Sequence, residues 1–146
     1  IGDGRMKNWV ENRIIELEIF NNFILLGSYP STEMPDFFAC ADALIVSLKK
    51  NPVFSLTIPA KLQSYFACGR PIIGSLDGEG AKIIEESGAG FTSPAEDSEK
   101  LALIVEKVYL SNSEERKLMG DKARQYYEHE FDSKVLLDKL LDIFNN

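Results

Sequence analysis

The chain has 146 residues, of which 45% are hydrophobic and 27% charged, and its formal net charge is −7. This length and balance predict one compact globular domain and exclude a disordered or fibrous chain. The negative charge disfavours a nucleic-acid partner, because phosphate backbones bind clustered Lys and Arg, and the longest apolar runs are far shorter than the ~20 residues that a membrane-spanning helix needs.

The first predicted element is a tight turn that leads from the end of a strand into a helix. Gly2 and Gly4 stand just ahead of an amphipathic segment, residues 5–18. Helical spacing in this segment is shown by its apolar residues, which are Met6, Trp9, Val10, Ile14 and Leu17. We therefore expect a helix packed on a sheet.

Two apolar runs follow and are predicted to be strands. Residues 23–26 form a wholly apolar run closed by Gly27, and residues 43–48 read ALIVSL. Continuous apolar runs of this length are typical of parallel strands covered on both faces. A helix that begins after Ser31 or Thr32 is predicted between them.

The rest of the chain continues the alternation of helices and strands. We predict a polar loop over residues 49–59, a helix over 60–68 ended by Gly69, a strand over 71–74, a turn over 77–80, a helix over 81–87 and a strand over 88–92. Three helices then end the chain. Their predicted N-caps are, in order, Asp97 or Ser98 for the first, Ser113 for the second and Ser133 for the third.

This alternation predicts an α/β fold with a doubly wound, Rossmann-like parallel sheet and C-terminal helices, in a single domain over residues 1–146. A flavodoxin-like receiver domain is the alternative, but nothing after Val46 supplies its phosphorylatable Asp. Ligands of doubly wound sheets bind beyond the carboxyl ends of the strands. The loops at that edge are residues 2–4, 27–32, 49–59 and 75–80.

Two of these loops have the composition of an anion site. Gly2 and Gly4 leave backbone N–H groups open beside a helix N-terminus, although a tight turn alone explains the same glycines. The second loop brings hydroxyl and apolar residues to a proline at or near the first helical position, with a lysine in the first turn. Its residues are Ser55, Thr57, Ile58, Pro59 and Lys61. A capped surface loop with a solvated lysine is the alternative.

Cysteine and histidine are scarce. Cys40 and Cys68 lie in the apolar stretches FFACA and YFACG and are predicted to be small buried residues, with a disulfide or a metal site as alternatives. His129 lies in the acidic run YYEHE, where a solvated position is expected. We therefore expect no zinc site, no Ser-His-Asp triad and a reducing, cytoplasmic setting.

Several short motifs in a fixed order resemble one protein family. They are Gly2-Asp3-Gly4, Leu26-Gly27, Ala41-Asp42, Pro59-x-Lys61, Ala67-x-Gly69-x-Pro71, Gly78-Glu79 and Gly88-x-Gly90. Their order resembles the C-terminal, nucleotide-sugar-binding domain of group 1 retaining glycosyltransferases of the GT-B architecture, over essentially the whole chain. The resemblance implies that the acceptor-binding domain lies outside this chain, that the first strand is incomplete, and that the chain alone is inactive.

Roles for individual residues are implied by the same resemblance. Gly2 and Gly4 would approach the diphosphate, Arg5 would add positive charge, and the main chain around Leu26 would read the base. Backbone N–H groups that begin the helix at residue 60, together with Lys61, would hold the diphosphate.

The chain departs from the family at a pair of glutamates that usually contact the ribose and the donor sugar. Their positions hold Ser64 and Leu56. Ser64 can still donate a hydrogen bond to a ribose hydroxyl, with Gln63 as an alternative, whereas Leu56 cannot replace a carboxylate. Glu79 becomes the candidate for the sugar contact by its position.

The implied function is transfer of a sugar from a nucleoside diphosphate donor, UDP in first place, to a glycan or lipid-linked acceptor in capsule, lipopolysaccharide or other surface-polysaccharide synthesis. No cofactor and no metal ion are expected, and the expected location is the cytoplasm, including the inner face of the membrane. Two alternatives remain: a non-hydrolysing nucleotide-sugar epimerase, for which His129 is misplaced, and a nucleotide-binding module without catalysis.

Overall fold

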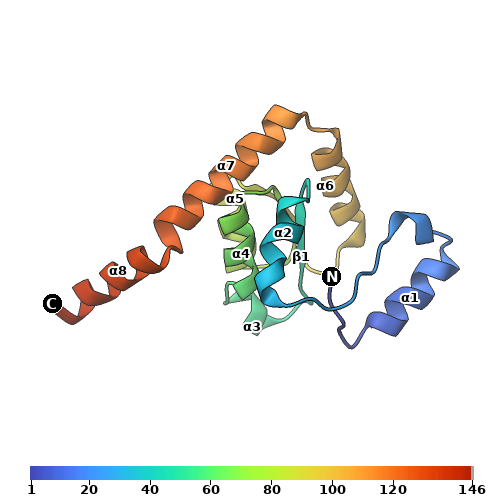
Figure 1. Cartoon of the computed structure of the whole chain (residues 1–146), viewed down its shortest axis with the longest axis horizontal. Coiled ribbons are helices and arrows are strands. Elements are labelled where there is room, and N and C mark those ends of the chain that lie inside the picture. The colour runs from blue at the N-terminus through green and yellow to red at the C-terminus, as the bar shows by residue number, and fades with distance from the viewer. Residues whose placement is uncertain (146) are drawn as a thin grey trace. The chain divides into compact units, whose positions relative to one another are not determined.

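The structure, a computed structural model, describes residues 1–145 (Figure 1). Two compact units make up the chain, a small one over Ile1–Phe37 and a large one that begins at Phe38. Within residues 1–145 there is no helix with the length and apolarity required to cross a membrane.

The small unit is built around α1 (Lys7–Glu16), followed by the 3-10 turns η1 (Phe20–Asn22) and η2 (Ser31–Glu33). The helix predicted over residues 5–18 is confirmed with slightly shorter bounds. Its expected buried face is wrong in part, because Ile14 is buried whereas Trp9 is 60% exposed. Too few residues surround α1 within this unit to cover an entire apolar face.

The strand predicted over residues 23–26 is also wrong. The segment is not paired in the sheet that the structure describes, and Ile24 is 80% exposed. Phe23 has the extended backbone of a strand, with φ −126° and ψ 123°, but a strand also requires a neighbouring backbone to complete its hydrogen bonds.

The large unit holds a sheet of three parallel strands in the order β1 (Leu44–Ser47), β2 (Ile72–Ser75) and β3 (Gly90–Ser93). Residues 44, 72 and 90 are in register across the three strands. These strands confirm the predictions for residues 43–48, 71–74 and 88–92, with shifts of one or two residues at their ends. The predicted α/β class and parallel sheet are confirmed.

Helices cover both faces of this sheet. Successive side chains of β2 point to opposite faces, and Ile72 belongs to the fully buried core formed with Phe66 of α4 (Ala60–Cys68) and Ile84 of α5 (Glu79–Ser87). On the opposite face Ile73 lies beside residues of α6 (Ser98–Leu110). The sheet is therefore doubly wound, as predicted. One correction concerns Ile45, which is 50% exposed because β1 is the edge of the described sheet.

The remaining helices are α2 (Met34–Ala39), α3 (Pro52–Ser55), α7 (Ser113–Glu130) and α8 (Ser133–Asn145). The cap predicted at Asp97 is confirmed. The caps predicted at Ser113 and Ser133 are wrong, because these residues are the first inside α7 and α8; the cap of α7 is Asn112, which forms a capping box with Glu115. In Figure 1, α7 and α8 are the orange and red helices that close the chain.

The C-terminal end of α4 packs closely on α7. A Cβ on Gly120 of α7 would lie 2.3 Å from the carbonyl oxygen of Gly69, and the Arg124 guanidinium donates to the carbonyl of Ala67 at 2.8 Å. The ring of Phe66 lies 5.0 Å, centroid to centroid, from that of Tyr126. This contact fixes α4 from the end opposite the predicted site.

The cysteine predictions are confirmed only in part. Cys68 is half-buried, and burial raises the pKa of its thiol, but Cys40 is exposed, so the prediction of a buried residue there is wrong. Cys40 follows the short helix α2, whose last turn leaves it on the surface. Both thiols are free, and His129 is exposed as predicted.

Candidate functional site

The predicted site of the large unit lies where the chain leaves β1 and β2. Both strands are parallel, so Ser47 and Ser75 end them at the same edge of the sheet. The loop after β1 leads through α3 into α4, and the loop after β2 leads into α5. The starts of α4 and α5 therefore lie at the edge where ligands of this class of sheet bind.

The helix α3 interrupts the loop predicted over residues 49–59. The side chain of Asn51 caps it by accepting a hydrogen bond from the Val53 N–H at 2.8 Å, and Pro52 occupies its first turn. An Asn-Pro pair ahead of a short apolar run is a helix-start signal that the sequence offered and that was missed.

The start of α4 presents backbone N–H groups to solvent. Pro59 is the N-cap, one position before the first helical residue, and it supplies no side-chain cap. The first amide to bond within the turn is that of Leu62, which donates to the Pro59 carbonyl at 2.8 Å. The N–H groups of Ala60 and Lys61 precede it and point out of the helix start, where the helix dipole favours an anion.

The surface of α4 presents Lys61 and Ser64 on one side. These residues are three apart and both exposed, so they lie on one face of the helix. Leu62 and Phe66 on the opposite face are fully buried and belong to the core. The phenol of Tyr65 donates to the Ile45 carbonyl at 3.3 Å, and burial raises its pKa.

The hydroxyl groups of the loop turn back onto α3. Ser55 donates to the Pro52 carbonyl at 2.8 Å, and Thr57 donates to the Phe54 carbonyl at 3.3 Å. In this arrangement either hydroxyl must rotate before it can donate to a ligand. Leu56, which lies between these two residues, is 79% exposed, and Ile58, which follows Thr57, is 38% exposed.

The start of α5 lies beside the start of α4. Gly78 is its N-cap, with φ 75° and ψ −143°, and Glu79 is its first residue and exposed. Gly80 is buried, and a Cβ on it would lie 3.2 Å from the Cδ of Pro59. The structure thus brings Lys61 and Glu79 onto two neighbouring helix starts.

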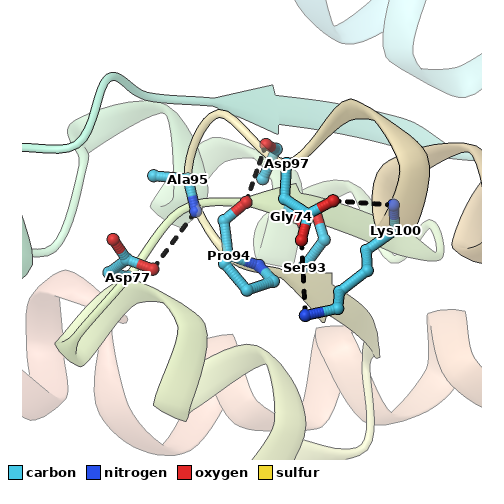
Figure 2. Close-up of polar contacts among 8 residues, drawn as sticks. Gly74, Asp77, Ser93, Pro94, Ala95, Asp97 and Lys100 are labelled. Carbon is cyan, nitrogen blue, oxygen red and sulfur yellow. Dashed lines mark hydrogen bonds and ion pairs between the residues drawn. The ribbon is translucent and has the colours of Figure 1, made fainter.

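Polar contacts hold the Gly78 turn to the loop after β3 (Figure 2). The carboxylate of Asp77 accepts a hydrogen bond from the Ala95 N–H at 3.1 Å. Nearby, the buried Ser93 donates to the Gly74 carbonyl at 3.4 Å, and Asp97 caps α6 by accepting from the Lys100 N–H at 3.0 Å. The loops after β2 and β3 therefore support each other.

We expect Asp77→Ala to lower the free energy of unfolding by about 1 kcal/mol, because it removes one hydrogen bond and leaves the Ala95 N–H without its acceptor. Asp77→Asn is the matched control, since its amide oxygen can still accept that bond. Urea unfolding followed by circular dichroism measures both variants. If Asp77→Ala were as stable as the wild type, the Asp77 contact would contribute nothing.

In the small unit the predicted residues are also adjacent. The Gly2 N–H donates to the Gly27 carbonyl at 2.6 Å, which joins the first turn to the segment that contains Leu26. Leu26 is 44% exposed, and Arg5 is exposed. A Cβ on Gly4 would meet no atom within 4 Å, so the backbone of this turn is open to a ligand.

Ligand contact by the predicted residues of both units stays a prediction. They are Gly2, Gly4, Arg5 and Leu26 in the small unit, and Ser55, Thr57, Ile58, Lys61, Ser64 and Glu79 in the large one. Among residues 1–145, no group of three or more His, Cys, Asp or Glu side chains is arranged to hold a metal ion.

A cavity of about 630 Å³ lies elsewhere, between α6 and α7. Its lining includes Phe91, Leu103, Leu110 and Leu118, and the ammonium of Lys107 lies 3.6 Å from the centroid of the Phe91 ring. We name this cavity the α6–α7 groove. An apolar lining and a lysine already engaged with a ring make it a poorer diphosphate site than the helix starts.

Comparison with known proteins gives concordant matches. The family model described as "Glycosyl transferases group 1" matches residues 1–126. The probable glycosyltransferase WbjE of Pseudomonas aeruginosa is 27% identical over 110 residues, which are 74% of this chain and 27% of that protein. The chain thus spans about a quarter of the length of this relative.

Two solved structures show the same fold. Anabaena Alr3699/HepE in complex with UDP-glucose matches with a TM-score of 0.80 and 19% identity, over 99% of this chain and 39% of that chain. WaaG, a glycosyltransferase involved in lipopolysaccharide biosynthesis, matches with a TM-score of 0.71 and 21% identity, over 97% of this chain and 36% of that chain.

Proposed function

Because the chain belongs to the group 1 glycosyl transferase family, we propose that it is the donor-binding domain of a glycosyltransferase and that it binds a nucleoside diphosphate sugar. The observation that carries this proposal is the start of α4, where Lys61 and unbonded helix N–H groups stand beside the start of α5. Positive groups in such an arrangement suit a diphosphate. The proposed domain takes in the whole chain.

We propose UDP as the nucleotide and a cell-surface glycan or a lipid-linked sugar as the acceptor. The choice of UDP is supported by the fold that the chain shares with Alr3699/HepE, whose crystal structure is in complex with UDP-glucose. What supports the acceptor is the fold shared with WaaG, which takes part in lipopolysaccharide biosynthesis. The proposed location is the cytoplasm, including the inner face of the membrane, where two free thiols stay reduced.

In the proposed reaction, the bond between the anomeric carbon and the diphosphate oxygen breaks, and the anomeric carbon forms a bond to a hydroxyl oxygen of the acceptor. Negative charge grows on the departing diphosphate, which takes up the proton that the hydroxyl loses. Lys61 and the N–H groups at the start of α4 would stabilise that charge, and the rigid loops would orient the donor. The transfer is proposed to retain the anomeric configuration and to involve no cofactor. No metal ion is proposed either, because the lysine and the helix dipole supply the positive charge that the diphosphate requires. Acceptor contacts are assigned to parts of the protein outside this chain.

A calorimetric titration of the chain with UDP, GDP, ADP and uridine tests this function. UDP should bind most tightly, and uridine should bind more weakly by about tenfold or more, since it lacks the charges that the helix start recognises. If no nucleoside diphosphate binds, the proposed function is wrong. If ADP or GDP binds more tightly than UDP, only the choice of base is wrong.

Gly4→Val is expected to weaken UDP binding without unfolding the small unit. The open space around Gly4 accommodates the new side chain in the free protein, so the free energy of unfolding should change by no more than about 0.5 kcal/mol. The branched side chain would stand where a phosphate approaches the turn. Calorimetry checks the affinity, and an unchanged UDP affinity would remove the Gly2–Gly4 turn from the site.

A further inference from the structure

Gly78 makes a close backbone contact that the sequence motifs do not explain. A Cβ placed on it would lie 1.9 Å from the carbonyl oxygen of Ser55 and 2.6 Å from the carbonyl carbon and Cα of Ser55. These are backbone atoms of α3, so no side-chain rotation could relieve the overlap. The peptide of Ser55 therefore rests directly on the N-cap of α5.

The backbone conformation of Gly78 reinforces this restriction. Its φ of 75° and ψ of −143° fall in a region that residues with a side chain rarely adopt. The turn is held in place from its other side by the bond between Asp77 and the Ala95 N–H. The backbone at Gly78 is thus held in place, and the end of α3 packs against it.

The segment that touches Gly78 is short and stiff. Ser55 ends α3, and only three residues separate it from Pro59, the N-cap of α4. Within that connection the N–H groups of Leu56 and Thr57 both donate to carbonyls of α3. A displacement of the Ser55 peptide would therefore be transmitted to the start of α4.

A second close approach, to side-chain atoms and not to backbone, lies two residues further along at Gly80. Gly80, in the first turn of α5, would place a Cβ 3.2 Å from the Cδ of Pro59 and 3.5 Å from the Cδ1 of Leu62. The N-cap of α5, Gly78, and its second residue, Gly80, thus face α3 and the start of α4 in succession. A side chain at either position would press against α3 or against Pro59 at the start of α4.

We propose that Gly78 is a positioning residue, whose bare Cα lets the Ser55 peptide rest on the start of α5 and so sets the place of Lys61 and the α4 amides. This role, which rests on the proposed function, gives Gly78 no direct contact with the donor. A methyl group on Gly78 would push α3 outward and move the start of α4 away from Glu79.

The test compares Gly78→Ala with Gly88→Ala in the 146-residue chain. Gly88 also has a positive φ, 68°, but a Cβ there would meet only the flexible side chain of Lys122, at 3.0 Å. UDP affinity is expected to fall by about tenfold or more in Gly78→Ala, as a misplaced binding group does, with uridine affinity nearly unchanged. Gly88→Ala should retain UDP affinity within a factor of about two.

Amide ¹H–¹⁵N spectra of the free variants give a readout that does not depend on the ligand. Shifts across residues 55–61 in Gly78→Ala, and none there in Gly88→Ala, are expected. Unchanged amides over residues 55–61, or an unchanged UDP affinity, would overturn the role of Gly78. If the wild-type chain binds no nucleoside diphosphate, the proposed function is wrong. The amide spectra of the free variants would still show whether Gly78 positions residues 55–61.

A second variant covers the case in which Gly78→Ala does not fold. One glycine inserted after Thr57 leaves Gly78 intact and separates α3 from α4 at an exposed position. This insertion should reduce UDP affinity by about tenfold or more, since the start of α4 is no longer tied to the Ser55 peptide. Wild-type affinity in the insertion variant would show that α3 does not position α4.

Discussion

Lys61→Ala should weaken UDP binding by about ten- to a hundredfold while uridine binding stays nearly unchanged. A charge-assisted hydrogen bond contributes about 1.5–3 kcal/mol, and about 1.4 kcal/mol corresponds to a factor of ten in affinity. Lys61 is the second residue of α4, so its ammonium and the helix N–H groups can face the same anion. Isothermal calorimetry with both ligands measures the difference.

The control for this experiment is Lys122→Ala, which removes an exposed lysine of α7 and should leave both affinities unchanged. Thermal stability should change little in either variant, because an exposed lysine contributes at most about 0.5 kcal/mol. A parallel fall of UDP and uridine affinity would mean that Lys61 acts through the fold or the base pocket. If neither falls, Lys61 is a solvated surface residue.

Phe66→Ala should lower the free energy of unfolding by about 3–5 kcal/mol, the usual cost of removing a buried aromatic ring. Phe66 is fully buried, and its ring lies 5.0 Å from the ring of Tyr126 and 5.9 Å from that of Phe131, centroid to centroid. The vacated space lies between α4 and α7, where the packing cannot close without moving a helix. Guanidinium unfolding followed by circular dichroism measures the loss.

Phe144→Ala is the matched control for the core substitution, since the ring of Phe144 is 77% exposed. It should change the free energy of unfolding by no more than about 0.5 kcal/mol. A loss below about 1 kcal/mol in Phe66→Ala would show that α4 is not anchored by this core.

The sequence predicted the elements whose signals are local. The helix α4 has the predicted bounds, because Gly69 ends it in the left-handed conformation that favours glycine, with φ 62°. The strands β1 and β2 were recognisable from short apolar runs, and Asp97 was recognisable as a cap. In each case neighbours in sequence determine the structure.

The predictions that failed depend on distant parts of the chain. Residues 23–26 have the composition of a strand, but a strand forms only where another backbone pairs with it. Cys40 lies in an apolar stretch, yet it follows the end of α2 and is exposed. The approach of the Ser55 peptide to Gly78 is invisible in the sequence, because the two residues are brought together by the tertiary fold alone.

A titration of the ¹⁵N-labelled chain with UDP, followed by amide ¹H–¹⁵N spectra, tests most directly that a diphosphate binds at the start of α4. The largest shifts should fall on the amides of residues 57–58, 60–64 and 78–80, and Lys61→Ala should reduce these shifts at the same UDP concentration. Shifts confined to the α6–α7 groove around Phe91 and Leu118, or no shifts at all, would contradict a donor site at these helix starts.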